Sequence, residues 1–166
     1  MAFAGRRAQS LGGHPDDVAA RIRRLLADLR PAAVVGAAAD GTDLLVLEAA
    51  LACDPPTVVH VVLPTARRVF AADSVEPRWR DRFSAALGRA VERGGTVRAL
   101  DAEPGDAAYR AANQAILDTA LGLAGGEPEA VLALVVGRDG EGAMVEDLLD
   151  RARSARVPSR RIDPSR

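Results

Sequence analysis

The chain has 166 residues, of which 48% are hydrophobic but only 3% aromatic, and its formal net charge is −1. That length suits one domain with one core, so we expect a single domain over residues 1–166. A near-neutral charge lacks the basic footprint of a nucleic-acid-binding protein, which argues against DNA or RNA as a partner. A core so poor in aromatic side chains must be built from Ala, Val and Leu, as is typical of helices packed on a parallel sheet.

The cysteine content and the first residues of the chain bear on the cellular compartment in which the protein is expected. The one cysteine, Cys53, has no partner for an internal disulfide, which favours a reducing compartment. The segment Met1–Arg7 lacks the apolar stretch of a signal peptide, and no run approaches the ~20 apolar residues that span a bilayer. We therefore expect a soluble, cytoplasmic protein with no membrane partner. No Cys, His or carboxylate cluster has the spacing of a metal site, so no metal or cofactor is expected.

The first third of the chain alternates short apolar runs with longer helical patterns. Residues 1–5 form a candidate first strand, and Pro15–Arg30 predicts a helix with one apolar face, which Pro31 ends. Ala32–Ala37 is a second candidate strand, and Asp40–Cys53 again shows helical spacing. The order strand, helix, strand, helix is typical of parallel βαβ units.

The clearest strand of the chain is Thr57–Leu63. Its near-continuous β-branched run suits a strand that is covered on both faces. A loop that carries Phe70, Asp73 and Ser74 is expected next, followed by a helix over Pro77–Arg93 that two glycines terminate.

The remaining elements continue the alternation as a strand, a helix, a strand, a helix and an edge strand. They are Thr96–Asp101, Tyr109–Ala124, Ala130–Gly137, Met144–Ala155 and Val157–Ile162. Consecutive parallel strands need a crossover of about a dozen or more residues, and each gap has that room. The pattern predicts an α/β fold of Rossmann-like type, a three-layer sandwich with a mainly parallel sheet and helices on both faces.

Glycine and other small residues gather where three predicted strands give way to the next helix. In an open parallel sheet the ligand crevice lies outside the carboxyl ends of the strands, where small residues let backbone amides approach a phosphate. Arginine can clamp a phosphate, and Asp or Thr at a helix start can bond a ribose hydroxyl or cap the helix. The candidate ligand-binding residues are Gly5, Arg6, Arg7, Gly36, Ala37, Gly41, Thr42, Asp43, Gly137, Asp139, Gly140 and Gly142.

Four stretches occur in a distinctive order: Gly36–Leu51, His60–Pro64, Phe70–Val75 and Trp79–Phe83. Their residues and order resemble the SLOG superfamily, which takes in the cytokinin-activating LOG phosphoribohydrolases, the DNA-processing protein A family and the sensor domains of TRPM channels. The resemblance spans nearly the whole chain. It implies a Rossmann-like sheet with a pocket for nucleotides or derivatives such as ADP-ribose or NAD.

The correspondence with LOG enzymes is uneven along the chain. Gly36, Gly41 and Asp43 match a Gly-x-Ala-x-Gly-x-Asp type of loop. LOG enzymes also carry Pro-Gly-Gly-x-Gly-Thr-x-x-Glu after a later strand, and residues 138–146 keep only two glycines and Glu146 of that motif. The resemblance makes Glu146 the candidate catalytic residue. The missing Thr and an added negative charge argue against hydrolysis in the LOG manner.

Three functions compete on this sequence. The leading hypothesis is a sensor that binds a nucleotide, ADP-ribose or NAD-like molecule without turnover. The alternative is a LOG-like N-glycosidase that acts on nucleoside monophosphates, and a third is an assembly module with an empty pocket. The sequence leaves a homo-oligomer open. We expect Gly41→Asp to abolish nucleotide binding with the fold intact, and Glu146→Gln to leave the affinity nearly unchanged.

Overall fold

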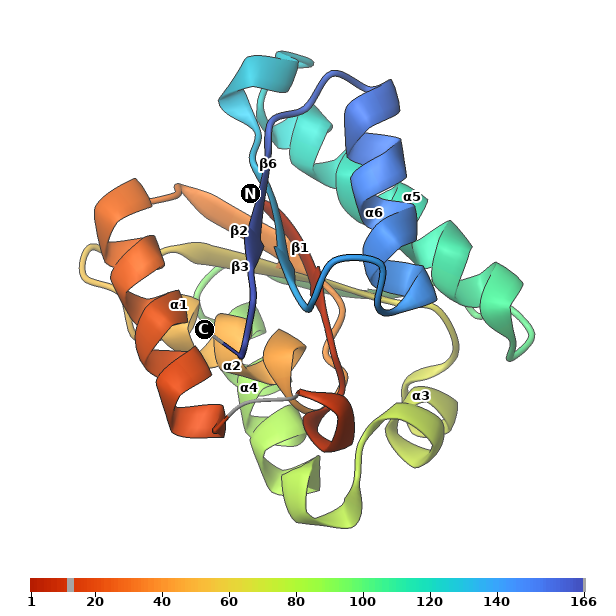
Figure 1. The fold of residues 1–166 in the computed structure, drawn as a ribbon. Coiled ribbons are helices and arrows are strands. Elements are labelled where there is room, and N and C mark those ends of the chain that lie inside the picture. The colour runs from red at the N-terminus through yellow and green to blue at the C-terminus, as the bar shows by residue number, and fades with distance from the viewer. Residues whose placement is uncertain (12–13, 166) are drawn as a thin grey trace.

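The computed structural model describes residues 1–11 and 14–165, which build one six-stranded sheet (Figure 1). Every strand pairs in parallel with its neighbours, in the spatial order β4-β3-β2-β1-β5-β6. The strands are β1 (Ala2–Gly5), β2 (Ala33–Gly36), β3 (Val58–Leu63), β4 (Thr96–Ala99), β5 (Ala133–Val136) and β6 (Ser159–Ile162). The predicted Rossmann-like α/β fold with a parallel sheet is confirmed.

Helices cover both faces of this sheet. Figure 1 shows α5 and α6 on one side, and α1, α2 and α4 on the other. The helices are α1 (Pro15–Leu29), α2 (Thr42–Leu51), α3 (Arg67–Ser74), α4 (Arg80–Glu92), α5 (Asp106–Leu123) and α6 (Ala143–Ser154), with short 3-10 turns η1 (Ala8–Ser10), η2 (Pro77–Trp79) and η3 (Pro128–Ala130). Through α5 the chain crosses from the edge strand β4 to β5, which lies between β1 and the other edge strand, β6.

Small aliphatic side chains fill both interfaces between sheet and helices. The interface under α1, α2 and α4 includes the fully buried Leu44, Leu47 and Leu51, and the interface under α5 and α6 includes Ile116 and Leu148. Helix α2 contacts α1, α4 and the sheet, so it is enclosed on nearly every side. That position explains why its sequence has no broad polar face.

The segment between β3 and η2 differs from the sequence prediction. Residues 67–74 were expected to form a loop and instead form the helix α3. The helix is too short to be stable alone, so tertiary contacts must hold it. Phe70 is fully buried and its ring lies 6.1 Å from that of Phe83 and 6.5 Å from that of Tyr109. These contacts between distant parts of the chain are invisible to local sequence patterns.

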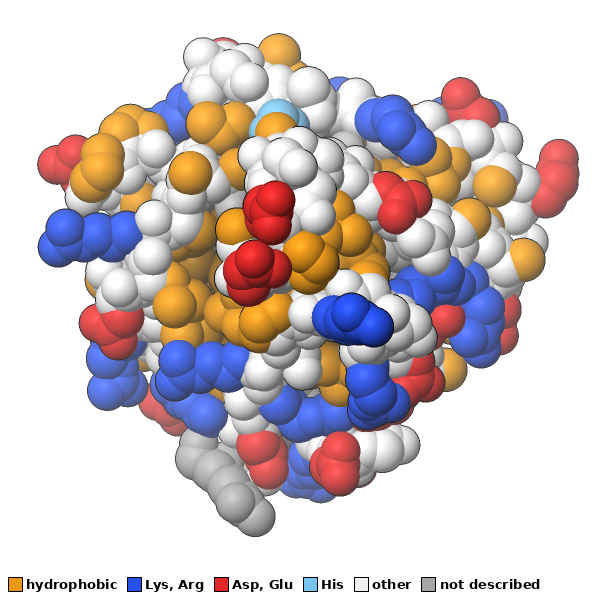
Figure 2. Space-filling model, turned by 90° about the horizontal axis from the view of Figure 1, so that it is seen from above, with side chains coloured by type: hydrophobic (Ala, Val, Ile, Leu, Met, Phe, Trp, Pro, Cys, Tyr) orange, Lys and Arg blue, Asp and Glu red, His pale blue; other side chains and the backbone are white. Residues whose placement is uncertain are grey.

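The two edges of the sheet differ in character. Figure 2 looks onto the amino-terminal end of the strands, where hydrophobic side chains gather near the middle of the face. Exposed Leu29 and Leu123 line a hollow of about 490 Å³ there. At the opposite edge the strands end in loops rich in polar residues, and the chain reverses its direction across the sheet between β1 and β5. Such a reversal point is where open α/β sheets bind ligands.

Candidate functional site

A cavity of about 300 Å³ lies at the carboxyl ends of β1, β2 and β3, between these strands and α5. Larger hollows at the other edge of the sheet are lined mostly by alkyl groups. The smaller cavity combines apolar walls with carboxyl, hydroxyl, amide and guanidinium groups, as is usual for ligand sites. Of the predicted binding residues, its lining includes Gly5, Arg7, Ala37 and Asp43.

Asp43 lies in the first turn of α2 and is 94% buried, its relative exposure being 6%. Its Oδ2 accepts the backbone N–H of Ala39 at 3.2 Å, while Oδ1 has no hydrogen-bond partner. Burial raises the pKa of Asp43 to about 7, and the negative charge of Asp40 adds to the rise. The hydrogen bond from Ala39 opposes the rise, as does the backbone N–H of Gly5, which lies nearby without making a hydrogen bond of normal geometry. A carboxyl group that titrates near neutral pH in a cavity is typical of functional sites.

Unpaired polar atoms concentrate at this edge of the sheet. Among the described residues, the buried side-chain oxygens that lack a partner are Thr42 Oγ1, Asp43 Oδ1 and Thr65 Oγ1. Thr42 and Asp43 begin α2, and Thr65 follows β3 by two residues. Each such atom costs about 1–3 kcal/mol, so native proteins rarely leave several together unless water or a ligand meets them.

Arg7, expected to clamp a phosphate, is held within the protein. Its Nη2 donates to Oδ2 of Asp40 at 2.9 Å, and its Nη1 donates to the carbonyl of Asp73 at 3.0 Å. The fully buried Asp40 also accepts the backbone N–H groups of Ala8 at 3.0 Å and Glu76 at 2.8 Å. One carboxylate thus joins the loops after β1, β2 and α3. Asp40 was not among the predicted site residues, and it shapes the cavity as a positioning residue.

Arg6 reaches in the other direction, toward the loop between β5 and α6. A Cβ at Gly137 would lie 3.3 Å from Cγ of Arg6, and one at Gly142 would lie 3.1 Å from its Cδ. Its Nη1 is 3.6 Å from a carboxylate oxygen of Glu141. The two glycines leave room for the arginine side chain, so the loops after β1 and β5 lie against each other.

Glu146, the candidate catalytic residue, lies in the first turn of α6 and contacts the loop between β5 and α6. Its Oε1 accepts a hydrogen bond from Nη2 of Arg161 at 2.8 Å and another from the backbone N–H of Gly140 at 3.2 Å. Arg161 also pairs with Asp139 at 3.3 Å and donates to the carbonyl of Arg138 at 2.7 Å. Within the described part of the chain, these residues form a braced loop beside the cavity and are not part of its lining.

The two predicted glycines at the strand ends serve close packing. A Cβ at Gly5 would lie 2.2 Å from the side chain of Thr42, and one at Gly36 would lie 2.2 Å from the ring of Phe3. Another residue at either position would require the neighbouring side chain or the backbone to shift. These glycines therefore set the distances between β1, β2 and α2, and so the shape of the cavity.

The predicted binding residues include none from α3 or α5, although both helices line the cavity. The hydroxyls of Ser74 and Tyr109 are hydrogen-bonded to each other at 2.5 Å across the cavity wall. The amide nitrogen of Asn113 donates to the carbonyl of Met144 at 2.8 Å and to Asp147 at 2.9 Å. Tyr109 and Asn113 are four residues apart on α5, so helical spacing of polar residues within an Ala-rich segment was the signal available.

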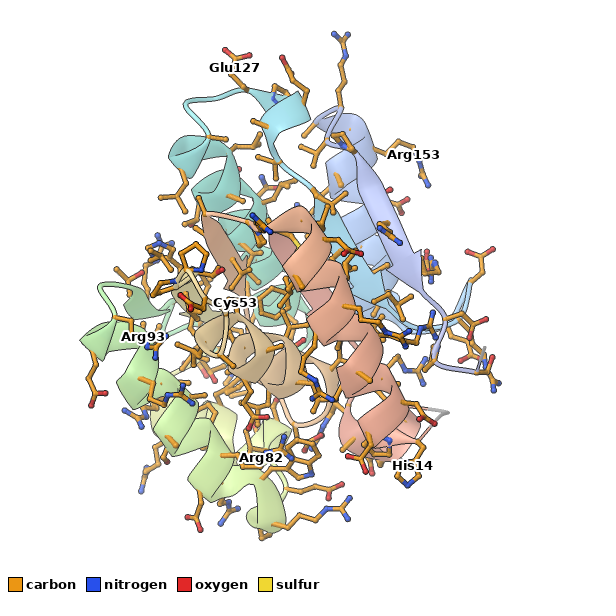
Figure 3. All side chains as sticks on the ribbon, turned by 90° about the vertical axis from the view of Figure 1, so that its left-hand side faces the viewer. His14, Cys53, Arg82, Arg93, Glu127 and Arg153 are labelled. Atoms are coloured by element: carbon orange, nitrogen blue, oxygen red, sulfur yellow. The ribbon has the colours of Figure 1, made fainter. Side chains whose placement is uncertain are left out.

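Other reactive residues lie away from the cavity. Figure 3 shows His14 pointing outward at one end of the molecule, and its exposed ring is 3.7 Å from Asp16. Cys53, which follows α2, is half-buried with a free thiol. Among residues 1–11 and 14–165, no group of three His, Cys, Asp or Glu side chains could hold a metal ion. No helix in the same residues is long and apolar enough to cross a membrane.

The chain matches no protein-family model, and no curated protein matches it significantly.

Proposed function

We propose that the protein binds a nucleotide or a nucleotide derivative such as ADP-ribose or NAD, as a sensor without turnover. The observation that carries the proposal is the cavity at the carboxyl ends of β1–β3, in which the buried Asp43 presents an unpartnered oxygen. The cavity lies at the carboxyl ends of the strands, the end of the sheet at which Rossmann-like folds bind such ligands. The resemblance to the SLOG superfamily points to the same ligand class.

The surroundings of Glu146 support binding without hydrolysis. A residue that assists ribose chemistry must reach the reacting sugar. Here the carboxylate is taken up by Arg161 and by the backbone of Gly140, beside the cavity and outside its lining. These contacts give Glu146 a sufficient structural role, so the LOG-like N-glycosidase stays the alternative.

The test is calorimetric titration of AMP, ADP-ribose and NAD into the protein and three variants. Ala37→Leu fills the cavity and should weaken binding at least tenfold. Ala115→Leu, at a half-buried alanine of α5 outside the lining, is the matched control and should bind as the parent does. Glu146→Gln should also leave the affinity unchanged.

Two results would contradict the proposal. Absence of binding for every compound in the parent protein would remove it altogether. Release of free base from AMP by the parent, lost in Glu146→Gln, would establish the glycosidase instead, because a carboxylate that stabilises an oxocarbenium-like transition state affects rate far more than ground-state affinity.

A further inference from the structure

The charges around the cavity do not favour a phosphate inside it. Asp43 lies within the cavity, and the exposed Asp73 and Asp106 belong to its lining. The guanidinium in the lining is that of Arg7, and its three nitrogens already donate to the carboxylate of Asp40 and the carbonyl of Asp73. A phosphate would therefore meet several carboxylates and a cation that is already neutralised, and like charges at short range repel strongly where water is excluded.

Two of the polar groups in the lining can accept hydrogen bonds from a ligand. Oδ1 of Asp43 has no partner. Asn113 uses its amide nitrogen for two acceptors, the carbonyl of Met144 and Asp147, which leaves its carbonyl oxygen to accept. Acceptors on both walls call for a ligand part that donates hydrogen bonds. Amino groups and hydroxyls of a nucleoside do so, and a phosphate dianion does not.

The rest of the lining suits a flat, uncharged ring. The half-buried Ala4, Ala37 and Tyr109 supply apolar surface from β1, the loop after β2 and α5, with the fully buried Phe3, Phe70 and Ile116 behind them. The volume of about 300 Å³ is at the lower end of ligand pockets, which span roughly 300–1,000 Å³. A nucleoside suits such a space better than a whole dinucleotide does.

We infer that the cavity takes the nucleoside end of the ligand, with hydrogen-bond donors of the base or sugar facing Asp43 and Asn113, and that the phosphate stays outside. This inference rests on the proposed nucleotide binding. It reverses the usual expectation for the carboxyl edge of a Rossmann-like sheet, where the phosphate sits against a helix start.

The experiment compares nucleosides with their 5′-monophosphates by calorimetry at pH 8.5, above the pKa of about 7 of Asp43, so that its carboxylate is charged and only accepts hydrogen bonds. Adenosine, guanosine, cytidine and uridine are titrated beside their monophosphates and inorganic pyrophosphate. For each nucleoside that binds, its monophosphate should bind with an affinity within threefold, because the phosphate adds no contact in the cavity. Pyrophosphate should not bind and should not compete.

The variant Asp43→Asn distinguishes the two possibilities by the direction in which the affinity for the monophosphate changes. If the nucleoside fills the cavity, the variant should weaken nucleoside and monophosphate equally, by about tenfold, because it replaces an acceptor oxygen by an amide. If a phosphate occupied the cavity, removal of the negative charge of Asp43 would increase the affinity for the monophosphate. Asp81→Asn, at an exposed position of α4, is the control and should change neither affinity.

The outcomes separate this inference from the proposed function. A monophosphate that binds tenfold or more tightly than its nucleoside, or pyrophosphate that competes with it, overturns the inference and leaves nucleotide binding intact. The wild-type ratio alone decides this point should Asp43→Asn fail to fold. If neither nucleosides nor nucleotides, ADP-ribose and NAD included, bind to the wild-type protein, the proposed function fails and the inference fails with it.

Discussion

Asp40 and Asp43 are both buried near the start of α2, yet their pKa values move in opposite directions. Burial alone would raise the pKa of Asp40, but the guanidinium of Arg7 and the N–H groups of Glu76 and Ala8 lower it below the ordinary value. For Asp43, among the described residues, backbone N–H groups alone oppose the effect of burial, and no cation does, so burial dominates and its pKa rises to about 7. Asp40 therefore stays charged as a structural anchor, whereas Asp43 exchanges a proton near neutral pH.

This contrast predicts the pH dependence of stability. An acid whose pKa is raised on folding binds its proton more tightly in the folded state, so stability falls as the pH rises from 3.8 through about 7. The shift of about three units corresponds to a loss of up to roughly 4 kcal/mol. Asp43→Asn should remove this loss and flatten the free energy of unfolding between pH 5 and pH 8, as measured by urea denaturation.

The control for that measurement is Asp16→Asn, at an exposed position in the first turn of α1. Its pH profile should run parallel to that of the parent. A profile of Asp43→Asn that also ran parallel to the parent would show that the Asp43 carboxyl is not the group responsible.

At the scale of elements, the loop after β1 packs directly on the start of α2. The N–H of Thr42 donates to the carbonyl of Arg6 at 3.1 Å. Gly41 has a positive φ of 87°, and a Cβ there would lie 2.4 Å from the backbone nitrogen of Ala8. The structure therefore contradicts the expectation that Gly41→Asp leaves the fold intact, because the glycine is needed for backbone packing before any ligand is bound.

Gly41→Ala should accordingly destabilise the protein more than its backbone angle alone requires. Gly94 is the control for a positive φ without a packing contact, because its φ is 81° and a Cβ there would meet nothing within 4 Å. Gly94→Ala should cost about 1 kcal/mol for the left-handed conformation. Gly41→Ala should cost about 3 kcal/mol in urea denaturation, since its ψ of −126° lies outside the left-handed region and packed backbone must also be displaced. Equal costs would mean that the contact with Ala8 relaxes freely.

For the whole molecule, the arrangement predicts unfolding in one cooperative step. Trp79 is buried beside α4, whereas α5 and α6 cover the other face, and both interfaces share the strands of one sheet. Loss of one interface exposes apolar side chains of the other, so neither half has a core of its own. Trp79 fluorescence and far-UV circular dichroism should give coincident urea transitions. A fluorescence change that clearly precedes the loss of helix would show that the α4 side unfolds alone.

The sequence by itself determined the fold class and the end of the sheet, at the carboxyl ends of the strands, where a ligand site is expected. Apolar runs such as Val58–Leu63 alternate with helical segments, and that periodicity requires parallel strands joined by covering helices. The end of each strand could be located to within a few residues. Gly5, Ala37 and Asp43 could be placed at the cavity because they directly follow or terminate strands, or begin a helix, and such positions are local properties of the chain.

Only the tertiary structure decided what each of these residues does. Arg7 and Glu146 carry charges that suit a ligand. In the folded protein, however, Asp40 accepts hydrogen bonds from Arg7, and Arg161 donates one to Glu146. Ser74 and Tyr109 meet across the cavity although 35 residues separate them. The reason is physical: periodicity fixes which face of an element is buried, whereas hydrogen-bond partners and pKa values depend on distances between segments that the local sequence does not encode.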